Sequence, residues 1–143
     1  MDIELIKIYG EYGVIGLLAF MGFLSLWFWV ERLLFYKEID IEKYESKKEL
    51  EVDLTKHVDI ISTCGSNAPY VGLLGTVFGI MLTFYTMGQA DGMDVNSIMS
   101  SLALALKATA MGLVVAIPAI VFTNHLGRRV DVLLARWDIA NGK

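Results

Sequence analysis

Two threonines and one lysine stand in the most apolar parts of this chain and are its candidates for chemistry. Thr76 lies in the uncharged run APYVGLLGTVFGIMLTFYTMG, residues 68–88, and Thr109 lies in a second apolar run in which Lys107 is the only charged residue. Threonine hydroxyls donate and accept hydrogen bonds. Two interpretations stay open for them: each hydroxyl bonds back to its own helix, or the two line a wet path between helices.

Lys107 needs a compensating contact wherever this run lies in a membrane, because insertion scales put the cost of a central lysine at about 2.5–3.5 kcal/mol. It could pair with a carboxylate of a partner or of its own bundle, or bond to carbonyls between subunits. It could also extend toward the outer surface, or itself gain and lose a proton. At about 100° per residue, Lys107 and Thr109 are roughly 200° apart around a helix and cannot both face one path. We therefore expect Lys107 to be structural or electrostatic rather than a proton carrier.

Other residue types exclude several classes of function. No metal-ligand spacing and no pairing of a nucleophile with a base occurs, and GLLGTVFG lacks the Gly-Lys-Ser/Thr ending of a phosphate-binding loop. The net charge of −4 is segregated into blocks without a basic stripe, which excludes nucleic acid as a partner. The single Cys64 is expected to be a small buried residue. The sequence therefore predicts neither an enzyme nor a metal or cofactor site.

Three apolar blocks must position the threonines and the lysine. They are residues 12–30, 68–88 and 97–122, in a chain of 143 residues of which 55% are hydrophobic. A helix that rises about 1.5 Å per residue needs roughly 20 residues to cross the hydrocarbon of a bilayer. Pro118 falls near the end of the third block and is expected to kink it. The pattern predicts an all-α integral membrane protein with three transmembrane helices.

Basic residues in the flanking segments predict the orientation of the chain. Residues 1–11 contain one Lys or Arg, residues 31–67 contain six, residues 89–96 none and residues 123–143 four. Because Lys and Arg concentrate on the cytoplasmic side, segments 31–67 and 123–143 are expected in the cytoplasm. The N-terminal segment 1–11, amphipathic as a helix, and the loop 89–96 are then periplasmic.

Apolar residues at helical spacing continue beyond the second and third blocks. They are Leu50, Leu54, Val58 and Ile61 on one side, and Val130, Leu133, Leu134 and Trp137 on the other. We expect both spans to extend into cytoplasmic helices whose apolar stripes pack together.

Small residues recur in the second and third blocks at spacings that let two helix backbones approach closely. They are Gly72, Gly75 and Gly79 in the second block, and Ala108, Gly112 and Ala116 in the third. The first block has no such stripe. We expect the second and third spans to form a closely packed pair and the first span to lie outside it, facing lipid.

The same two blocks carry a paired motif. APYVGLLGTVFGIM, followed one short loop later by ALKATAMGLVVAIPAIV, resembles the signature of the ExbB/TolQ/MotA proton-channel family over residues 68–121. Within that family the chain is most similar to the ExbB branch, because it has three spans and a very small cytoplasmic segment. It departs from many relatives at Leu104, where they carry a glutamate five residues before the second threonine.

The resemblance implies a proton-channel and scaffold subunit of the TonB–ExbB–ExbD complex of the bacterial inner membrane, where proton motive force drives TonB-dependent import across the outer membrane. It implies a homopentamer around an ExbD-like single-span partner with an intramembrane aspartate, and contact with a TonB-like protein. It also gives Thr76 and Thr109 the role of lining the proton path. The alternatives are a TolQ-type subunit of the Tol-Pal envelope complex and a non-conducting membrane scaffold.

One absence in the sequence independently favours a partner. Residues 60–90 and 95–123 contain no Asp, Glu or His. A proton relay needs a group within the membrane that gains and loses a proton, and threonine does not do so. If protons cross here, another chain must therefore supply the carboxylate.

Overall fold

The computed structural model describes residues 3–89 and 94–142, and these fold into helices joined by short turns. In chain order the elements are α1 (Ile3–Glu38), a short 3₁₀ helix η1 (Ile41–Lys43), α2 (Lys47–Leu54), α3 (Val58–Gln89) and α4 (Val95–Ala140). Three of them, α1, α3 and α4, are long and apolar enough to cross a membrane. The prediction of an all-α protein with three transmembrane helices is confirmed.

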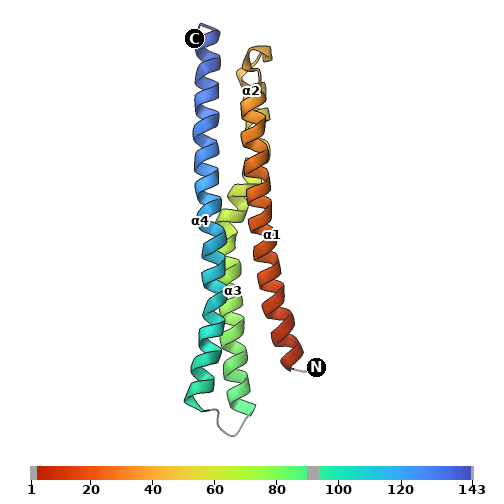
Figure 1. Cartoon of the computed structure of the whole chain (residues 1–143), viewed down its shortest axis with the longest axis vertical. Helices are drawn as coiled ribbons and strands as arrows, with labels where there is room; N and C mark the ends of the chain where they lie inside the picture. The colour runs from red at the N-terminus through yellow and green to blue at the C-terminus, as the bar shows by residue number, and fades with distance from the viewer. Residues whose placement is uncertain (1–2, 90–93, 143) are drawn as a thin grey trace.

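The three long helices all exceed the thickness of a bilayer. They contain 36, 32 and 46 residues, which corresponds to lengths of about 54, 48 and 69 Å, against roughly 30 Å of hydrocarbon. Figure 1 shows α4 running the length of the molecule, with α3 beside one half of it and α2 near the other half. Where the hydrocarbon begins and ends along each helix stays a prediction.

The N-terminal segment and the connection between α3 and α4 differ from the bounds expected from the sequence. Residues 3–11 do not form a separate segment but belong to α1, which continues unbroken through the apolar block. In the expected loop 89–96, Gln89 ends α3 and Val95 begins α4, while residues 90–93 lie outside the described part. Asp94 caps α4 by accepting a hydrogen bond from the backbone N–H of Ser97 at 2.9 Å. Hydrogen bonds from Ser97 lower the pKa of Asp94.

Both inner spans continue beyond their apolar blocks, but the stripe that begins at Leu50 is divided between two helices. α3 starts at Val58, and α2, which carries Leu50 and Leu54, is separated from it at residues 55–57. His57 has a φ of 72°. That conformation is left-handed and ends a helix, and His adopts it more readily than most non-glycine residues. The stripe still faces one cluster, because the turn redirects α2 without removing its apolar side.

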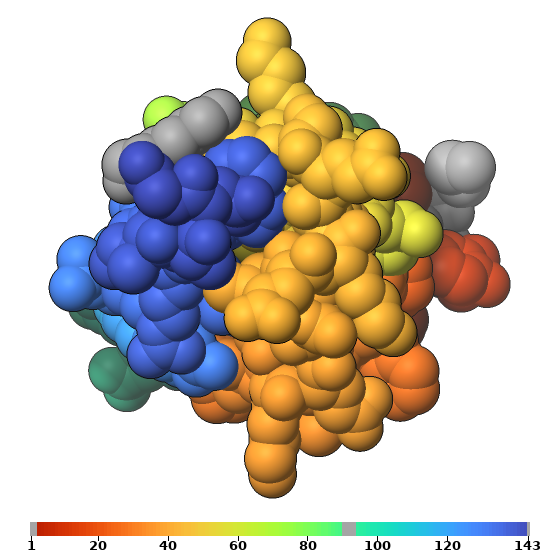
Figure 2. Space-filling view, turned by 90° about the horizontal axis from the view of Figure 1, so that it is seen from above, coloured from red at the N-terminus to blue at the C-terminus, as the bar shows by residue number. Residues whose placement is uncertain are grey.

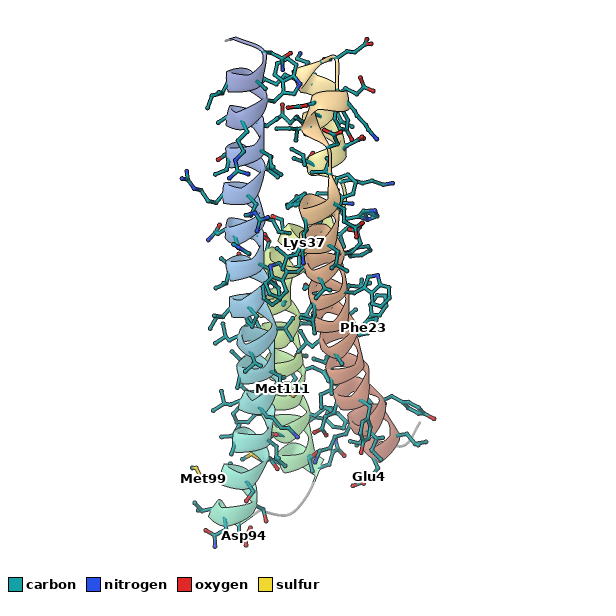
Figure 3. All side chains as sticks on the ribbon, turned by 45° about the horizontal axis from the view of Figure 1, so that its top comes forward. Glu4, Phe23, Lys37, Asp94, Met99 and Met111 are labelled. Carbon is teal, nitrogen blue, oxygen red and sulfur yellow. The ribbon has the colours of Figure 1, made fainter. Side chains whose placement is uncertain are left out.

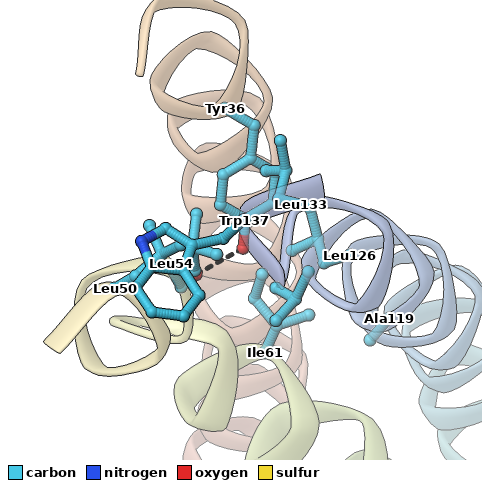
Figure 4. Packing of buried hydrophobic residues seen from close by; sticks show 9 residues of the cluster. Tyr36, Leu50, Leu54, Ile61, Ala119, Leu126, Leu133 and Trp137 are labelled. Atoms are coloured by element: carbon cyan, nitrogen blue, oxygen red, sulfur yellow. Dashed lines mark hydrogen bonds between the residues drawn. The ribbon is translucent and has the colours of Figure 1, made fainter. Parts of the chain in front are cut away.

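The larger apolar cluster lies at the end of the molecule that carries the C-terminus (Figure 4). It joins α1, α2, α3 and α4 through Tyr36, Leu50, Leu54, Ile61, Ala119, Leu126, Val130, Leu133 and Trp137. The Tyr36 hydroxyl donates to the Leu54 carbonyl, and Trp137 Nε1 donates to the Tyr44 carbonyl at 3.0 Å. Figure 2 shows the segment with η1 and α2 pressed against the last turns of α4. The two expected apolar stripes therefore pack together.

Arg32 ties α1 to the last turn of α2. It is almost fully buried, with 3% of its surface exposed. Its Nη1 donates to the Asp53 carbonyl at 2.7 Å, and its Nε lies 2.6 Å from Oε2 of Glu31. The Tyr44 hydroxyl donates to the Asp53 carboxylate at 2.6 Å, which raises the pKa of Tyr44 to about 12. A buried guanidinium needs such contacts, since removing one partner would leave a charge without compensation.

A smaller cluster, mostly inside the apolar blocks, packs α1 against α3 and α4. It contains Leu18, Met21, Cys64, Ala68 and Ala116. The opposite side of α1 is apolar but exposed: Phe20, Phe23 and Trp27 each expose more than half of their surface. Figure 3 shows Phe23 on the outer side of α1. An apolar side of which more than half stays exposed fits a helix that faces lipid.

We expect Leu54→Ala to lower the free energy of unfolding by about 2–5 kcal/mol, because it leaves a cavity in the larger cluster, where Leu54 is fully buried. The change is measured as a fall in the thermal unfolding midpoint of the protein in detergent. Val52→Ala is the matched control in the same helix, since Val52 is 68% exposed. Equal effects of the two substitutions would show that the cluster does not stabilise the fold.

Candidate functional site

The site begins where the backbones of α3 and α4 touch. A Cβ atom added at Gly72 would lie 2.6 Å from the carbonyl oxygen of Ala108, and one added at Gly112 would lie 2.7 Å from that of Ala68. Both distances are shorter than a carbon and an oxygen tolerate, and the clash is with backbone, which cannot move aside. Only glycine fits at these two positions. Gly72 and Gly112 therefore set the distance between the two helices.

The remaining small residues lie on both sides of this crossing. A Cβ at Gly75 would lie 2.8 Å from Cβ of Ala108 and 2.9 Å from a methyl group of Val14, so α1, α3 and α4 converge there. A Cβ at Gly79 would lie 2.8 Å from Cβ of Ala105. Close contact thus continues along α3 for two turns from Gly72 toward the α3–α4 connection.

Ala116 and Pro118, also singled out in the sequence, lie on α4 toward its C-terminus from Gly112. Ala116 is buried in the smaller cluster. Pro118 is exposed inside α4, which continues as a helix to Ala140.

Thr76 and Thr109 meet at this crossing. Their hydroxyl groups hydrogen-bond to each other, and the Thr76 hydroxyl also donates to the Ala105 carbonyl at 2.9 Å. A hydroxyl has one proton to donate, so Thr109 is the donor to Thr76. The order of donation is therefore Thr109 to Thr76 to the carbonyl of Ala105.

The bonding of this pair separates it from three other threonines of α3 and α4. Thr83, Thr86 and Thr123 each donate to a carbonyl one turn earlier in their own helix, at 2.8–2.9 Å. Thr76 instead donates to the facing helix, so the own-helix interpretation does not describe it. Thr76 is 5% exposed, while Thr109 is only partly buried. The oxygen of Thr109 accepts no hydrogen bond from the described residues and can serve a group outside the chain.

Lys107 lies two residues before Thr109 but turns to another side of α4. Its side chain is exposed and lines a cavity between α1, α3 and α4, which Glu4 and Glu11 of α1 also line. Within the described ranges, the ion pairs are Arg32–Glu31 and Lys47–Asp138, so Lys107 is in neither. The lysine and the threonine pair are therefore separate features of α4.

The two histidines of the chain each contact an aromatic side chain of α1. His57 stacks on Phe28 with ring centroids 4.6 Å apart, and its buried Nδ1 has no hydrogen-bond partner among the described residues. His125 accepts a hydrogen bond from Trp29 Nε1 at 3.3 Å. In the described part of the chain, no three His, Cys, Asp or Glu side chains gather as a metal site.

We expect Gly72→Ala to lower the free energy of unfolding by about 1–3 kcal/mol, because the added methyl group forces α3 away from α4. The fall in the thermal unfolding midpoint in detergent measures it. Gly13→Ala is the control, since a Cβ at Gly13 meets no atom within 4 Å. An unchanged midpoint for Gly72→Ala would contradict the close approach described above.

The sequence of this chain is similar to those of known proteins. The family model described as "MotA/TolQ/ExbB proton channel family" matches residues 30–139. The "Putative biopolymer transport protein ExbB-like 2" of Helicobacter pylori is 50% identical over 129 residues, which are 90% of this chain and 86% of that protein.

Two further relatives differ in how much of their length is matched. The "Biopolymer transport protein ExbB" of Aquifex aeolicus is 49% identical over 140 residues, 98% of this chain and 95% of that protein. The "Tol-Pal system protein TolQ" of Pseudomonas aeruginosa is 38% identical over 87 residues, 61% of this chain and 38% of that protein.

Proposed function

The chain belongs to the MotA/TolQ/ExbB proton channel family, and on that premise we propose that it is the proton-conducting and scaffold subunit of an energy-transducing complex. It is a multi-pass protein of the inner membrane with the N-terminus in the periplasm and the C-terminus in the cytoplasm. Copies of it assemble, as a homopentamer, around a single-span ExbD-like partner. The proton motive force then drives a TonB-like protein for import across the outer membrane.

The matches that cover most of this chain favour the ExbB branch over the TolQ branch. The relatives named ExbB of Helicobacter pylori and Aquifex aeolicus are 49% identical to this chain over 96% and 98% of its length, whereas the TolQ relative of Pseudomonas aeruginosa is 38% identical over 61% of it. Two other relatives named ExbB match over 54% of this chain, so a TolQ-type subunit stays the alternative.

The hydroxyl pair of Thr76 and Thr109 is the observation that carries the proposal. Its hydrogen bonds run between α3 and α4, and the partly buried Thr109 lies at the outer end of the series. Its oxygen can accept a hydrogen bond from a protonated carboxyl group. Its proton can turn from Thr76 toward a carboxylate once that group has lost its proton.

This alternation would let a carboxyl group of the partner cycle between two protonation states beside the pair. A buried carboxylate is costly unless donors surround it, and a hydroxyl that changes its donor direction lowers that cost. Because the spans of this chain offer no Asp, Glu or His of their own, the group that carries the proton belongs to the partner.

The exposed apolar sides of α3 and α4 fit the proposed assembly. Leu74 on α3 and Val114 and Ile117 on α4 expose 61–70% of their surface. In a membrane these sides can pack against neighbouring copies or a central partner helix as well as against lipid. The proposal assigns them to the contacts between subunits.

Thr109→Val in the complex reconstituted into liposomes with its partner is expected to lower proton flux about tenfold or more. The variant removes a hydrogen bond to a charged group, which is worth roughly 1.5–3 kcal/mol. Thr76→Val should act in the same direction, since Thr76 orients the Thr109 hydroxyl.

Thr123→Val is the matched control for these two variants. Thr123 is also on α4, but its hydroxyl donates to Ala119 of its own helix at 2.9 Å, so flux should stay as in the unmodified protein. Unchanged flux in both Thr76→Val and Thr109→Val would favour the non-conducting scaffold instead.

Proton flux should also depend on the partner. Liposomes that contain this chain alone should pass protons no faster than empty liposomes under an imposed gradient, and flux should appear when the ExbD-like protein is added. Substituting the partner's intramembrane aspartate by asparagine should abolish that flux. Conduction by this chain alone would show that the carboxylate argument is wrong.

A further inference from the structure

A cavity of about 360 Å³ lies under the first turns of α1, between that helix and the inner pair. Figure 1 shows α1 leaning away from α3 and α4 toward its N-terminus. The cavity ends where Val14 packs on Gly75 and Ala108. Its volume falls in the range of binding sites for small ligands.

Two features keep this cavity open. A Cβ at Gly10 would clash with the ring of Phe78, so α1 rests on that ring and cannot move closer. The facing wall is made of the small residues Gly79, Ala105 and Ala108. The space therefore follows from the packing of the three helices.

Charged side chains line the cavity in equal numbers of each sign. Lys7 and Lys107 bring two positive charges, and Glu4 and Glu11 bring two negative ones. Lys7, Glu11 and Lys107 take part in neither of the ion pairs found among the described residues. Hydroxyl groups of Thr83, Thr86 and Ser101 also line it. The site thus offers both signs of charge, but the three charges do not satisfy one another.

The surroundings of the cavity are those of a membrane interface. Leu104 lines the cavity and is 56% exposed, and Leu5 and Ile8 of α1 expose 47% and 44%. Residues 4–14 of α1 span about 15 Å, so with the first span predicted to begin at residue 12 the cavity reaches from the headgroup region into the hydrocarbon. Val14, Ile15 and Leu82 make the walls apolar. An occupant must therefore be polar at one end and apolar at the other.

We propose that this cavity binds the headgroup of a zwitterionic aminophospholipid, with its acyl chains along the apolar walls. The lipid phosphate lies against the ammonium groups of Lys7 and Lys107, and the lipid ammonium lies against the carboxylate of Glu11. Charge-assisted hydrogen bonds of this kind are stronger than neutral ones. An anionic lipid would compensate the lysines but leave the carboxylate of Glu11 opposed to a second negative charge, whereas a zwitterion offers Glu11 an ammonium group.

The bound lipid would also explain Lys107. The lysine side chain leans toward the N-terminus of α4, the same direction as the headgroup region, and meets an anionic group there. Of the interpretations left open by the sequence, extension toward the outer surface is the one this site supports. The inference depends on the chain lying in a membrane and not on proton conduction.

The test is lipid retention by the full-length protein. Nanodiscs are prepared with equal amounts of phosphatidylethanolamine, phosphatidylglycerol and phosphatidylcholine, the protein is extracted in mild detergent, and the lipids that remain are counted by native mass spectrometry. We expect phosphatidylethanolamine to be retained at least about tenfold over the other two, since only it offers both a phosphate and a hydrogen-bonding ammonium.

Lys107→Met and Glu11→Gln should each reduce this preference severalfold. Lys37→Met and Glu38→Gln are the matched controls near the other end of α1, where both side chains are exposed and outside the cavity, and they should change nothing. Thr86→Leu narrows the cavity without altering a charge and should also reduce retention. Thermal unfolding in detergent checks that each variant is folded.

Three outcomes would overturn the proposal. Equal retention of the three lipids would mean that only acyl chains occupy the cavity. Preference for phosphatidylglycerol would mean that the lysines act without the carboxylates. A preference for phosphatidylethanolamine that survives Lys107→Met, Glu11→Gln and Thr86→Leu in folded protein would place the lipid elsewhere on the chain.

Discussion

The contact between the backbones of α3 and α4 at Gly72 and Gly112 is the constraint on which the rest of the structure depends. Between helices in lipid there is little hydrophobic driving force, so two helices associate through close packing and hydrogen bonds. Removing the side chains at these two positions permits that approach. It is also what places Thr76 and Thr109 within hydrogen-bonding distance of each other. The glycines therefore create the polar contact as well as the packing.

The two ends of the molecule are held together by different forces. At the end that carries the C-terminus, large side chains form an apolar cluster, and Arg32, Tyr36 and Trp137 donate to backbone carbonyls around it. At the crossing of α3 and α4, the contacts are made by glycine, alanine and threonine. Large apolar side chains stabilise helix contacts in water, where burial of apolar area is favourable. Small side chains stabilise helix contacts in lipid, where the gain comes from close packing of the backbones.

The position of α1 also depends on which of its side chains pack and which stay exposed. Its apolar residues near the middle pack on the inner pair, while Phe20, Phe23 and Trp27 stay exposed. Toward its N-terminus it rests on Phe78 and leans away, which opens the charged cavity. The helix α1 thus packs on the outside of the α3–α4 pair, and the charged side chains of its first turns line the cavity between the three helices.

The sequence by itself determined the three spans, the small-residue faces and the family, because apolar length, residue size and motif are local properties of the chain. It did not determine the break before Val58, since the left-handed backbone of His57 has no signal in the apolar spacing. Nor did it determine what Thr76 bonds to or that Lys107 shares a cavity with Glu11. Those depend on how two or three helices sit against each other, and only the tertiary structure decided them.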